Sequence, residues 1–381
     1  MEERPRAVED VVSTMFDNVF ANKRVLITGH TGFKGTWLTS WLLKLGAHVT
    51  GYSDRIPTEP SMFEILGLAD RIDHHLGDVR DLAAFSAVVR AAQPDFVFHL
   101  AAQAIVSTSY KEPLDTISVN VMGTATVMEA LRQVEHPCVA VIITSDKCYE
   151  NVEWEWGYRE TDRLGGKDIY SGSKGAAEVI FHSYVESFFR KSDCPVRLAS
   201  ARAGNVIGGG DWAADRIVVD CMRSWAAGKP VELRSPSATR PWQHVLEPLS
   251  GYLQLAAVMA AGKVAQGDSF NFGPPSEQNR TVLELMRDLS AYWHFTDPAG
   301  AYTVTGNIPF HEAGLLKLNC DKALLHLKWH ASLNYEQVVR LVSEWYYGYY
   351  RGNAEMYGLT MDQIGQYEAH AQGRGLPWTR A

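Results

Sequence analysis

The first half of the chain alternates short apolar runs with longer stretches in which apolar residues recur at helical spacing. This alternation is typical of parallel strands that are joined by crossover helices. It predicts helices at residues 34–45, 115–132 and 170–189, and strands at residues 24–28, 48–53, 72–76, 96–100, 138–144 and 196–201. The first half is therefore expected to build an α/β fold around one parallel sheet.

Beyond residue 201 the pattern changes to glycine-rich loops, isolated strands and shorter helices. A chain of 381 residues is longer than the size at which a single hydrophobic core stops growing. We therefore expect a Rossmann-type, doubly wound parallel sheet in residues 1–200, which binds a dinucleotide, and a smaller C-terminal substrate-binding domain in residues 201–381. Residues 269–272 predict one more short strand, which can return to the main sheet.

Charge and composition argue against several classes of protein. The formal net charge of −8 is spread along the chain, which disfavours nucleic acid as the main ligand. Residues 1–20 lack the apolar core of a signal peptide, and no apolar run is long enough to span a bilayer. The five cysteines are widely spaced, and the histidines lack the spacing of metal ligands. We expect a cytoplasmic protein that binds no metal, membrane or nucleic acid.

A glycine-rich segment, residues 29–35, follows the first predicted strand and opens the first predicted helix. In such a turn glycine permits a tight bend, and the N–H groups of the helix approach a pyrophosphate. The spacing is Gly-x-x-Gly-x-x-Gly rather than Gly-x-Gly-x-x-Gly, so a plain strand-to-helix turn remains the alternative. The cofactor-binding candidates in this segment are Gly29, Thr31, Gly32, Phe33 and Gly35.

Further cofactor-binding candidates follow the later strands, because ligands of open α/β sheets bind at the carboxyl ends of strands. Asp54 lies about twenty residues beyond the last glycine, where a carboxylate accepts hydrogen bonds from the adenosine ribose. It favours NAD over the 2′-phosphorylated cofactor, although the adjacent Arg55 suits a 2′-phosphate. The other candidates are Asp78, expected at the adenine edge, and Val79, Leu100, Ala101 and Ala102.

Tyr170 and Lys174 form a Tyr-x-x-x-Lys pair at the start of a predicted helix. Residues at i and i+4 lie on one face, so the phenol and the ammonium group address the same point. A cation beside a phenol lowers the pKa of the phenol, and with a positive nicotinamide nearby Tyr170 becomes a base near neutral pH. An isolated pair of this kind is usually two surface residues, but its place after a Rossmann-like half favours a catalytic pair that also contacts the cofactor.

Together these features resemble the extended short-chain dehydrogenase/reductase family over nearly the whole chain. Within that family the chain is similar to the CDP-glucose 4,6-dehydratases in residues 32–38, 144–149, 202–212 and 240–245. The resemblance implies a cycle in which Tyr170 removes the C4 hydroxyl proton as hydride passes to NAD+. Water then leaves across C5 and C6, and hydride returns to C6. The expected product is a CDP-4-keto-6-deoxyhexose, and no external reductant is consumed.

The resemblance also implies the remaining catalytic roles. Ser145 is expected to hydrogen-bond the C4 oxygen, Asp146 to protonate the departing C6 hydroxyl, and Lys147 to take the C5 proton. Related dTDP-glucose dehydratases carry Asp-Glu where this chain has Asp-Lys. Lys147 must therefore lose its own proton through burial or nearby positive charge. A lysine that holds a substrate hydroxyl or forms a salt bridge is the alternative.

The same resemblance implies a CDP-hexose substrate that contacts residues in both halves of the chain. Arginine forks suit its diphosphate, although each such residue can instead stabilise a surface loop. Ser107 departs from the family pattern, because an arginine is expected near this position in a loop that approaches the hexose. The exact sugar therefore stays open. The substrate-binding candidates are Gln103, Asn205, Arg216, Arg240 and His244.

Two alternatives remain. A nucleotide-sugar 4-epimerase or a simple reductase uses the same fold, although an epimerase has no need for the paired Asp146 and Lys147. A catalytically silent NAD-binding regulator would have no need for Tyr170 and Lys174. The resemblance also implies a homodimer that is formed through the predicted helices at residues 115–132 and 170–189.

Overall fold

The computed structural model describes residues 15–275, 277–293, 295, 298–305, 315–352 and 354–380, so most of the amino-terminal segment considered above lies outside the described residues. The main sheet has seven strands in the order β11-β6-β5-β4-β1-β2-β3, and each neighbouring pair is parallel. The predicted Rossmann-type fold is confirmed. The strands are β1 (Arg24–Thr28), β2 (His48–Ser53), β3 (Asp73–Leu76), β4 (Phe96–His99), β5 (Cys138–Ile143), β6 (Val196–Ala203) and β11 (Ser269–Phe272).

The central strands are apolar because helices cover both faces of the sheet. Every residue of β5 is buried, as expected for a strand in the middle of a parallel sheet. Alternate residues of a strand point to opposite faces. In β4, Phe96 and Phe98 accordingly join one apolar core, and Val97 joins another.

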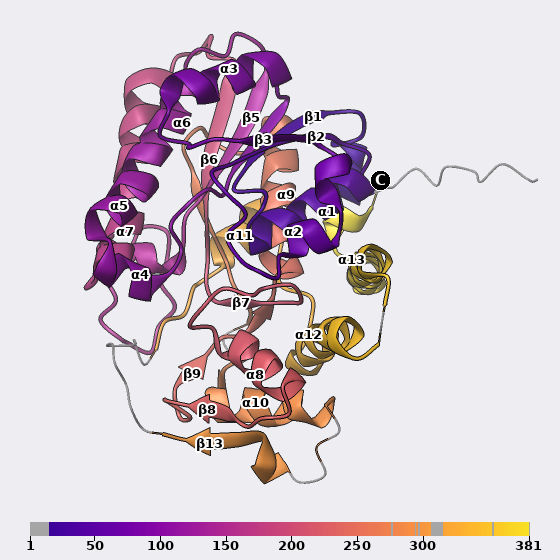
Figure 1. Ribbon diagram of the computed structural model, residues 1–381. Coiled ribbons are helices and arrows are strands. Elements are labelled where there is room, and N and C mark those ends of the chain that lie inside the picture. The colour runs from indigo at the N-terminus through magenta and orange to yellow at the C-terminus, as the bar shows by residue number, and fades with distance from the viewer. Residues whose placement is uncertain are drawn as a thin grey trace, which may run out of the picture.

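Two layers of helices enclose these cores. Figure 1 shows α3, α5, α6 and α7 together on one face of the sheet, and α1 and α9 lie on the other. The predicted helix at residues 115–132 is divided into α5, a π-helical turn (Ser118–Met122) and α6, and the one at 170–189 ends in a second π-helical turn (Val185–Phe189). The helices are α1 (Phe33–Lys44), α2 (Met62–Ile65), α3 (Leu82–Ala92), α4 (Val106–Lys111), α5 (Pro113–Ile117), α6 (Gly123–Leu131), α7 (Ile169–Tyr184) and α9 (Leu246–Ala260).

A second lobe lies beyond one end of the sheet, at the bottom of Figure 1. Its short strands form two-stranded sheets with the pairings β10-β7, β12-β9 and β13-β8. Its elements are β7 (Val206–Ile207), α8 (Ile217–Ala226), β8 (Val231–Leu233), β9 (Thr239–Arg240), β10 (Gln243–His244), β12 (Arg280–Thr281), α10 (Val282–Ala291) and β13 (Tyr302–Val304).

The chain returns to the main sheet after entering the second lobe. Helix α9 packs on β5 and β6, and β11 pairs with β6 at the edge of the sheet, as the apolar run at residues 269–272 predicted. Three later helices are α11 (Asp321–Leu327), α12 (Tyr335–Tyr350) and α13 (Met356–Gly373), of which α13 packs against α1. The division into residues 1–200 and 201–381 stays a prediction. Within the described ranges no helix is long and apolar enough to cross a membrane.

Candidate active site

A cavity of about 1180 Å³ opens at the carboxyl ends of the strands and is lined by residues of both lobes. It brings together the candidate residues that lie far apart in the sequence, with the exception of His244. Its lining includes the cofactor-binding candidates Gly29, Thr31, Gly32, Phe33, Gly35, Asp54, Asp78, Val79, Leu100, Ala101 and Ala102. It also includes the catalytic candidates Ser145, Asp146, Lys147, Tyr170 and Lys174, and the substrate-binding candidates Gln103, Asn205, Arg216 and Arg240.

The glycine segment forms the turn between β1 and α1. Gly29 has a φ of 75°, and a side-chain carbon placed on it would lie 2.7 Å from the backbone nitrogen of Ala101. A side-chain carbon on Gly35 would overlap the carbonyl oxygen of Gly29. Only glycine lets the end of β1, the segment after β4 and the first turn of α1 approach this closely. The N–H groups of that first turn and the helix dipole make this part of the cavity suitable for a pyrophosphate.

Polar contacts fix the loops around the glycine turn. The Thr31 hydroxyl donates a hydrogen bond to the Arg55 carbonyl oxygen at 2.7 Å, which ties the turn to the loop after β2. Asp54 lies in that loop with its carboxylate 3.5 Å from Nε of Arg55, and both side chains are exposed. The carboxylate and the guanidinium are therefore both available at the ribose position that the sequence predicted.

Asp78 lines the cavity with its carboxylate already paired. Both of its oxygens accept hydrogen bonds from Arg80, at 2.9 Å and 2.5 Å, which holds the pKa of Asp78 below its usual value. Arg80 also donates to Asp115 at 2.7 Å. Arg80 was not selected from the sequence. Asp78 is its neighbour in the chain, but Asp115 comes within reach only when the segment after β3 meets α5.

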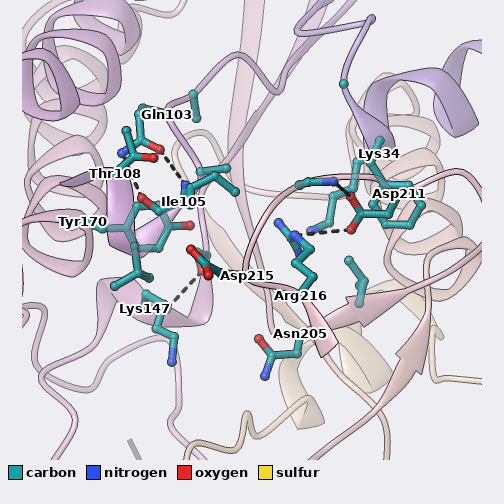
Figure 2. A pocket seen from close by; sticks show the side chains of 18 of the residues that line it. Lys34, Gln103, Ile105, Thr108, Lys147, Tyr170, Asn205, Asp211, Asp215 and Arg216 are labelled. Atoms are coloured by element: carbon teal, nitrogen blue, oxygen red, sulfur yellow. Dashed lines mark hydrogen bonds and ion pairs between the residues drawn. The ribbon is translucent and has the colours of Figure 1, made fainter. Parts of the chain in front are cut away.

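The chain turns into the cavity directly after β5. Ser145 caps a short 3-10 helix (Asp146–Cys148) by accepting a hydrogen bond from the N–H of Lys147 at 3.2 Å. Its hydroxyl donates to the Asp146 carboxylate at 2.9 Å. Asp146 is buried, whereas Lys147 is partly exposed and lines the cavity (Figure 2). A hydroxyl, a carboxyl and an amine are thus presented by three consecutive residues.

Tyr170 and Lys174 lie on the first turns of α7, one turn apart. Asp168 caps this helix by accepting a hydrogen bond from the N–H of Ser171 at 2.9 Å. Both side chains are buried, and burial lowers the pKa of Lys174 to about 8. Burial also raises the pKa of Tyr170 to about 12, against a hydrogen bond with Ser145 that lowers it. Without cofactor the pKa of Tyr170 therefore lies above its ordinary value, because desolvation outweighs the Ser145 hydrogen bond and the charge of Arg216. The expectation of a lowered phenol pKa included the bound nicotinamide and stays a prediction.

A buried ion pair connects the two catalytic segments, which are the start of α7 and the residues after β5. Glu178, one turn beyond Lys174, pairs with Arg202 of β6 at 2.8 Å, and both side chains are almost fully buried. Glu178 also accepts hydrogen bonds from the hydroxyls of Thr144 and Ser200, the latter at 2.9 Å. Because Thr144 directly precedes Ser145, this network joins α7 to the end of β5. It fixes the catalytic segments relative to each other.

Gln103 is hydrogen-bonded to its own loop and to α5. Its amide nitrogen donates to the Ile105 carbonyl oxygen at 3.0 Å and to the Thr116 hydroxyl at 2.8 Å. Its amide oxygen accepts from the N–H of Ile105 at 2.6 Å. Gln103 therefore lines the cavity and holds the loop that leads into α4, the helix that carries Ser107 (Figure 2).

The second lobe contributes cations to the opposite wall of the cavity. Arg216, directly before α8, lies 3.3 Å from the Asp211 carboxylate, as Figure 2 shows, and Arg240 donates to the Thr239 carbonyl oxygen at 2.8 Å. Asn205 follows β6 and lines the same wall. These positions suit the anionic part of a ligand.

His244 is the one candidate that does not line the cavity. It lies in β10 with a fully buried ring that packs edge-on against Trp37, 5.8 Å between ring centroids. Burial lowers its pKa to about 3, and its Nδ1 accepts from the N–H of Leu246 at 3.3 Å. Its position in the interior explains why a histidine beside a conspicuous motif is not at the site.

Lys34 also lines the cavity, although it was not among the candidates, because only the glycines around it and their neighbours were selected. It stands inside the glycine turn and makes no hydrogen bond or ion pair with any residue in the described ranges. Burial lowers its pKa to about 8, repulsion from Arg216 and Lys174 acts in the same direction, and Asp146 opposes it. Its ammonium lies 6.0 Å from the centroid of the Tyr252 ring. A lysine without an acidic partner in this place adds positive charge where the cavity meets α1.

Comparison with known proteins gives one matching family and several relatives. The family model described as GDP-mannose 4,6 dehydratase matches residues 26–342. The chain is 44% identical over 338 residues to a CDP-glucose 4,6-dehydratase of Salmonella typhimurium, which covers 88% of this chain and 93% of that protein. It is 27% identical over 287 residues to a dTDP-glucose 4,6-dehydratase of Mycolicibacterium smegmatis, with coverage of 73% and 82%.

Solved structures share the fold at lower identity. An epimerase of Methanothermobacter thermautotrophicus superposes with a TM-score of 0.74 at 19% identity, covering 91% of this chain and 96% of its own. A double mutant of a dTDP-glucose 4,6-dehydratase from Streptomyces venezuelae, solved with NAD, superposes with a TM-score of 0.73 at 19% identity, with coverage of 88% and 99%. Dehydratases and epimerases thus share this architecture.

Proposed function

The chain belongs to the GDP-mannose 4,6-dehydratase family, and from this premise we propose that it converts CDP-glucose to CDP-4-keto-6-deoxyglucose and water with NAD as its cofactor. The observation that carries the proposal is the 44% identity to a CDP-glucose 4,6-dehydratase over nearly its whole length. The meeting of Ser145, Asp146, Lys147 and Tyr170 at one cavity adds to it. A simple epimerase has no use for an acid and a base beside its tyrosine.

The cavity suits NAD together with a nucleotide sugar. Its volume of about 1180 Å³ exceeds the range of about 300–1,000 Å³ that is usual for one drug-sized ligand. The first turn of α1 would hold the pyrophosphate, Asp54 the adenosine ribose, and Arg216 and Arg240 the diphosphate of the sugar nucleotide. When bound, NAD supplies the acceptor for the hydride that leaves C4 and the donor of the hydride that returns to C6.

The first step requires a base at the C4 hydroxyl. Tyr170 takes the hydroxyl proton while the Ser145 hydroxyl holds the C4 oxygen. Because burial raises the pKa of Tyr170 to about 12 even with the Ser145 hydrogen bond and Arg216 acting against it, the phenolate needs further stabilisation by nearby positive charge. Lys174, one helical turn away, supplies one charge, and the oxidised cofactor supplies another.

The second step removes water from the 4-keto sugar. A ketone at C4 acidifies the C5 proton, and Lys147 is the base that takes it. The bond between C6 and its oxygen breaks, and Asp146 donates the proton with which the hydroxyl leaves as water. Lys147 returns its proton to C5 as C6 is reduced, so the substrate has lost one water. Tyr170 must then release the proton it took from the C4 hydroxyl and Asp146 must regain one, and exchange with solvent in the open cavity resets both groups.

A homodimer and a cytoplasmic location also belong to this proposal. Large apolar side chains are exposed along α5, the π-helical turn after it, α7 and the π-helical turn that ends it, which are the segments expected to pair between copies. These exposed side chains are Leu114 (80%), Ile117 (39%), Met122 (57%), Val179 (52%) and Phe188 (40%).

The test is to incubate the purified, NAD-loaded protein with CDP-glucose, without added reductant, and to measure the mass of the product by mass spectrometry. A product lighter by one water, with no net formation of NADH, is expected. The same assay with dTDP-glucose, GDP-mannose and UDP-glucose measures the choice of nucleotide. Unchanged masses for all four sugars would contradict the dehydratase and favour an epimerase, which NMR of the recovered sugar detects.

A further inference from the structure

Asp215 occupies an unusual place in the loop between β7 and α8. Its φ of 59° lies in the left-handed region, which non-glycine residues seldom adopt, although aspartate tolerates it better than most. Its neighbour Arg216 points to the side of the cavity where Lys34 and Asp211 lie (Figure 2). Asp215 points the other way, to the side with Tyr170 and Lys147 (Figure 2). The side chains of Asp215 and Arg216, although adjacent in the chain, therefore point to opposite sides of the cavity (Figure 2).

The carboxylate of Asp215 is held from both lobes. The hydroxyl of Ser107, in α4 of the first lobe, donates to its Oδ2 at 2.6 Å. A guanidinium nitrogen of Arg234 lies 3.6 Å from its Oδ1, beyond hydrogen-bonding distance. All three residues line the cavity, and the Asp215 side chain remains 46% exposed. One hydroxyl thus orients the group while leaving most of its acceptor capacity unused.

The free acceptor capacity suits a neutral sugar. An ionised carboxylate has about four lone-pair sites, and the Ser107 hydroxyl uses one of them. Hexose hydroxyls are donors, and hydrogen bonds to a carboxylate are roughly twice as strong as those between neutral groups. Because Ser107 is uncharged, it orients the carboxylate without adding to the positive charge of Arg234, whereas an arginine at position 107 would occupy both oxygens.

We propose that Asp215 is a specificity-determining residue that binds hydroxyls of the hexose, and that Ser107 positions its carboxylate for this purpose. The inference rests on the proposed function, because it takes the ligand of this wall to be the sugar half of a nucleotide sugar. It gives a role to the serine that stands where an arginine was expected.

The test compares binding of CDP-glucose with binding of CDP alone, by isothermal titration calorimetry. The protein is loaded with NADH, which cannot accept the C4 hydride, so that CDP-glucose binds without being converted. Asp215→Asn removes the charge and keeps the shape, and asparagine tolerates a positive φ. This variant should bind CDP-glucose about tenfold more weakly, the usual cost of losing a charge-assisted hydrogen bond, and CDP within twofold of the wild type. Ser107→Ala should show a smaller loss that is again confined to CDP-glucose.

Glu232→Gln serves as the control, because it removes another exposed, cavity-lining carboxylate from the same lobe. It should leave both affinities unchanged. Equal losses for CDP and CDP-glucose in Asp215→Asn would overturn the inference and assign Asp215 to contact between the lobes. No loss for either ligand would overturn it as well.

The proposed function fails on a separate measurement. If the wild type binds CDP-glucose but removes no water from it, the proposed dehydratase function is wrong. The loss of affinity for CDP-glucose but not for CDP in Asp215→Asn still decides the role of Asp215. If the wild type binds neither CDP nor CDP-glucose, both proposals are overturned.

Discussion

The two walls of the cavity hold their functional groups by different means. On the sheet wall, Tyr170, Lys174 and Asp146 are buried, and they stand on α7 or directly after β5. On the second-lobe wall, Asp215 and Arg234 are about 40% exposed and stand in loops outside helices and strands. The three groups on the first wall stand on or directly beside regular structure, whereas the loop residue Asp215 on the second is held by Ser107 of α4 and Arg234.

The difference follows from what each wall has to do. Proton transfer needs groups that are held in a fixed geometry and whose pKa values are shifted by burial, and buried helices and strands provide both. Recognition of a sugar needs donors and acceptors at the right places, which exposed loops on a rigid scaffold can provide. Substitutions on the sheet wall should therefore change the rate most, and those on the second-lobe wall should change affinity.

The largest effect is expected for Tyr170→Phe, which removes the base of the first step. Turnover of CDP-glucose should fall by about 10³–10⁴-fold, the upper part of the range for general-base catalysis. Stopped-flow absorbance should show no enzyme-bound NADH, because oxidation at C4 is blocked. The affinity for CDP should stay unchanged, because the second lobe is intact. If CDP affinity falls by as much as turnover does, the two walls do not have separate roles.

Lys147→Ala should reduce turnover by about 10²–10³-fold while leaving the first step intact. Oxidation at C4 should proceed, so enzyme-bound NADH should accumulate in a single turnover while no water is lost. Lys147→Met is the matched variant, because it keeps the length of the side chain and removes the amine. Normal water loss in both variants would show that Lys147 only contacts the substrate or forms a salt bridge.

Glu178→Ala should destabilise the protein by about 3–5 kcal/mol, because it leaves the Arg202 guanidinium buried without a counter-charge. Urea denaturation followed by circular dichroism measures the change. Glu178→Gln keeps the packing and an acceptor, so a smaller loss is expected. The double variant Glu178→Leu with Arg202→Met should be more stable than Glu178→Ala, because no unpaired charge remains. If it is less stable, the ion pair does not support the sheet wall in this way.

The sequence was informative where function depends on neighbours in the chain. The glycine turn and the Tyr170/Lys174 pair are local patterns with a fixed period, and the strands around them were predicted to within a few residues. The contact between Ser107 and Asp215 joins residues 108 positions apart, across two lobes. No periodicity reports such a contact, and a positive φ at a non-glycine residue leaves no pattern either.

Burial matters for two side chains whose surroundings the sequence did not reveal. The Tyr-x-x-x-Lys spacing, with a bound nicotinamide, predicted a lowered phenol pKa at Tyr170, and the family resemblance predicted a ligand-binding role for His244. Both depend on how much protein surrounds the group, which a single sequence does not reveal. Tyr170 is desolvated beside the cavity, and His244 is desolvated in the interior behind it.

The smallest effect is expected for substitution of Lys34. It tests how much the burial of a charge lowers the free energy of unfolding at the point where the two walls meet. Its pKa of about 8 in the folded protein lies below the usual 10.5 of an unfolded chain. Below pH 8 the lysine is charged in both states, so the full cost of burying the charge is present. Between pH 8 and 10.5 the unfolded chain binds more protons than the folded one, so the free energy of unfolding rises with pH.

Lys34→Met should therefore stabilise the cofactor-free protein at pH 7 by about 1–2 kcal/mol, allowing for contact of the lysine with solvent in the cavity. It should also flatten the rise in stability between pH 7 and 10, of which Lys174 retains a part because burial lowers its pKa to about 8 as well. Urea unfolding across this pH range measures both effects, with the exposed Lys23→Met as the control. A destabilised Lys34→Met protein at pH 7 would mean that the lysine is paired rather than held ready for an anion, since only an unpaired charge is costly to bury.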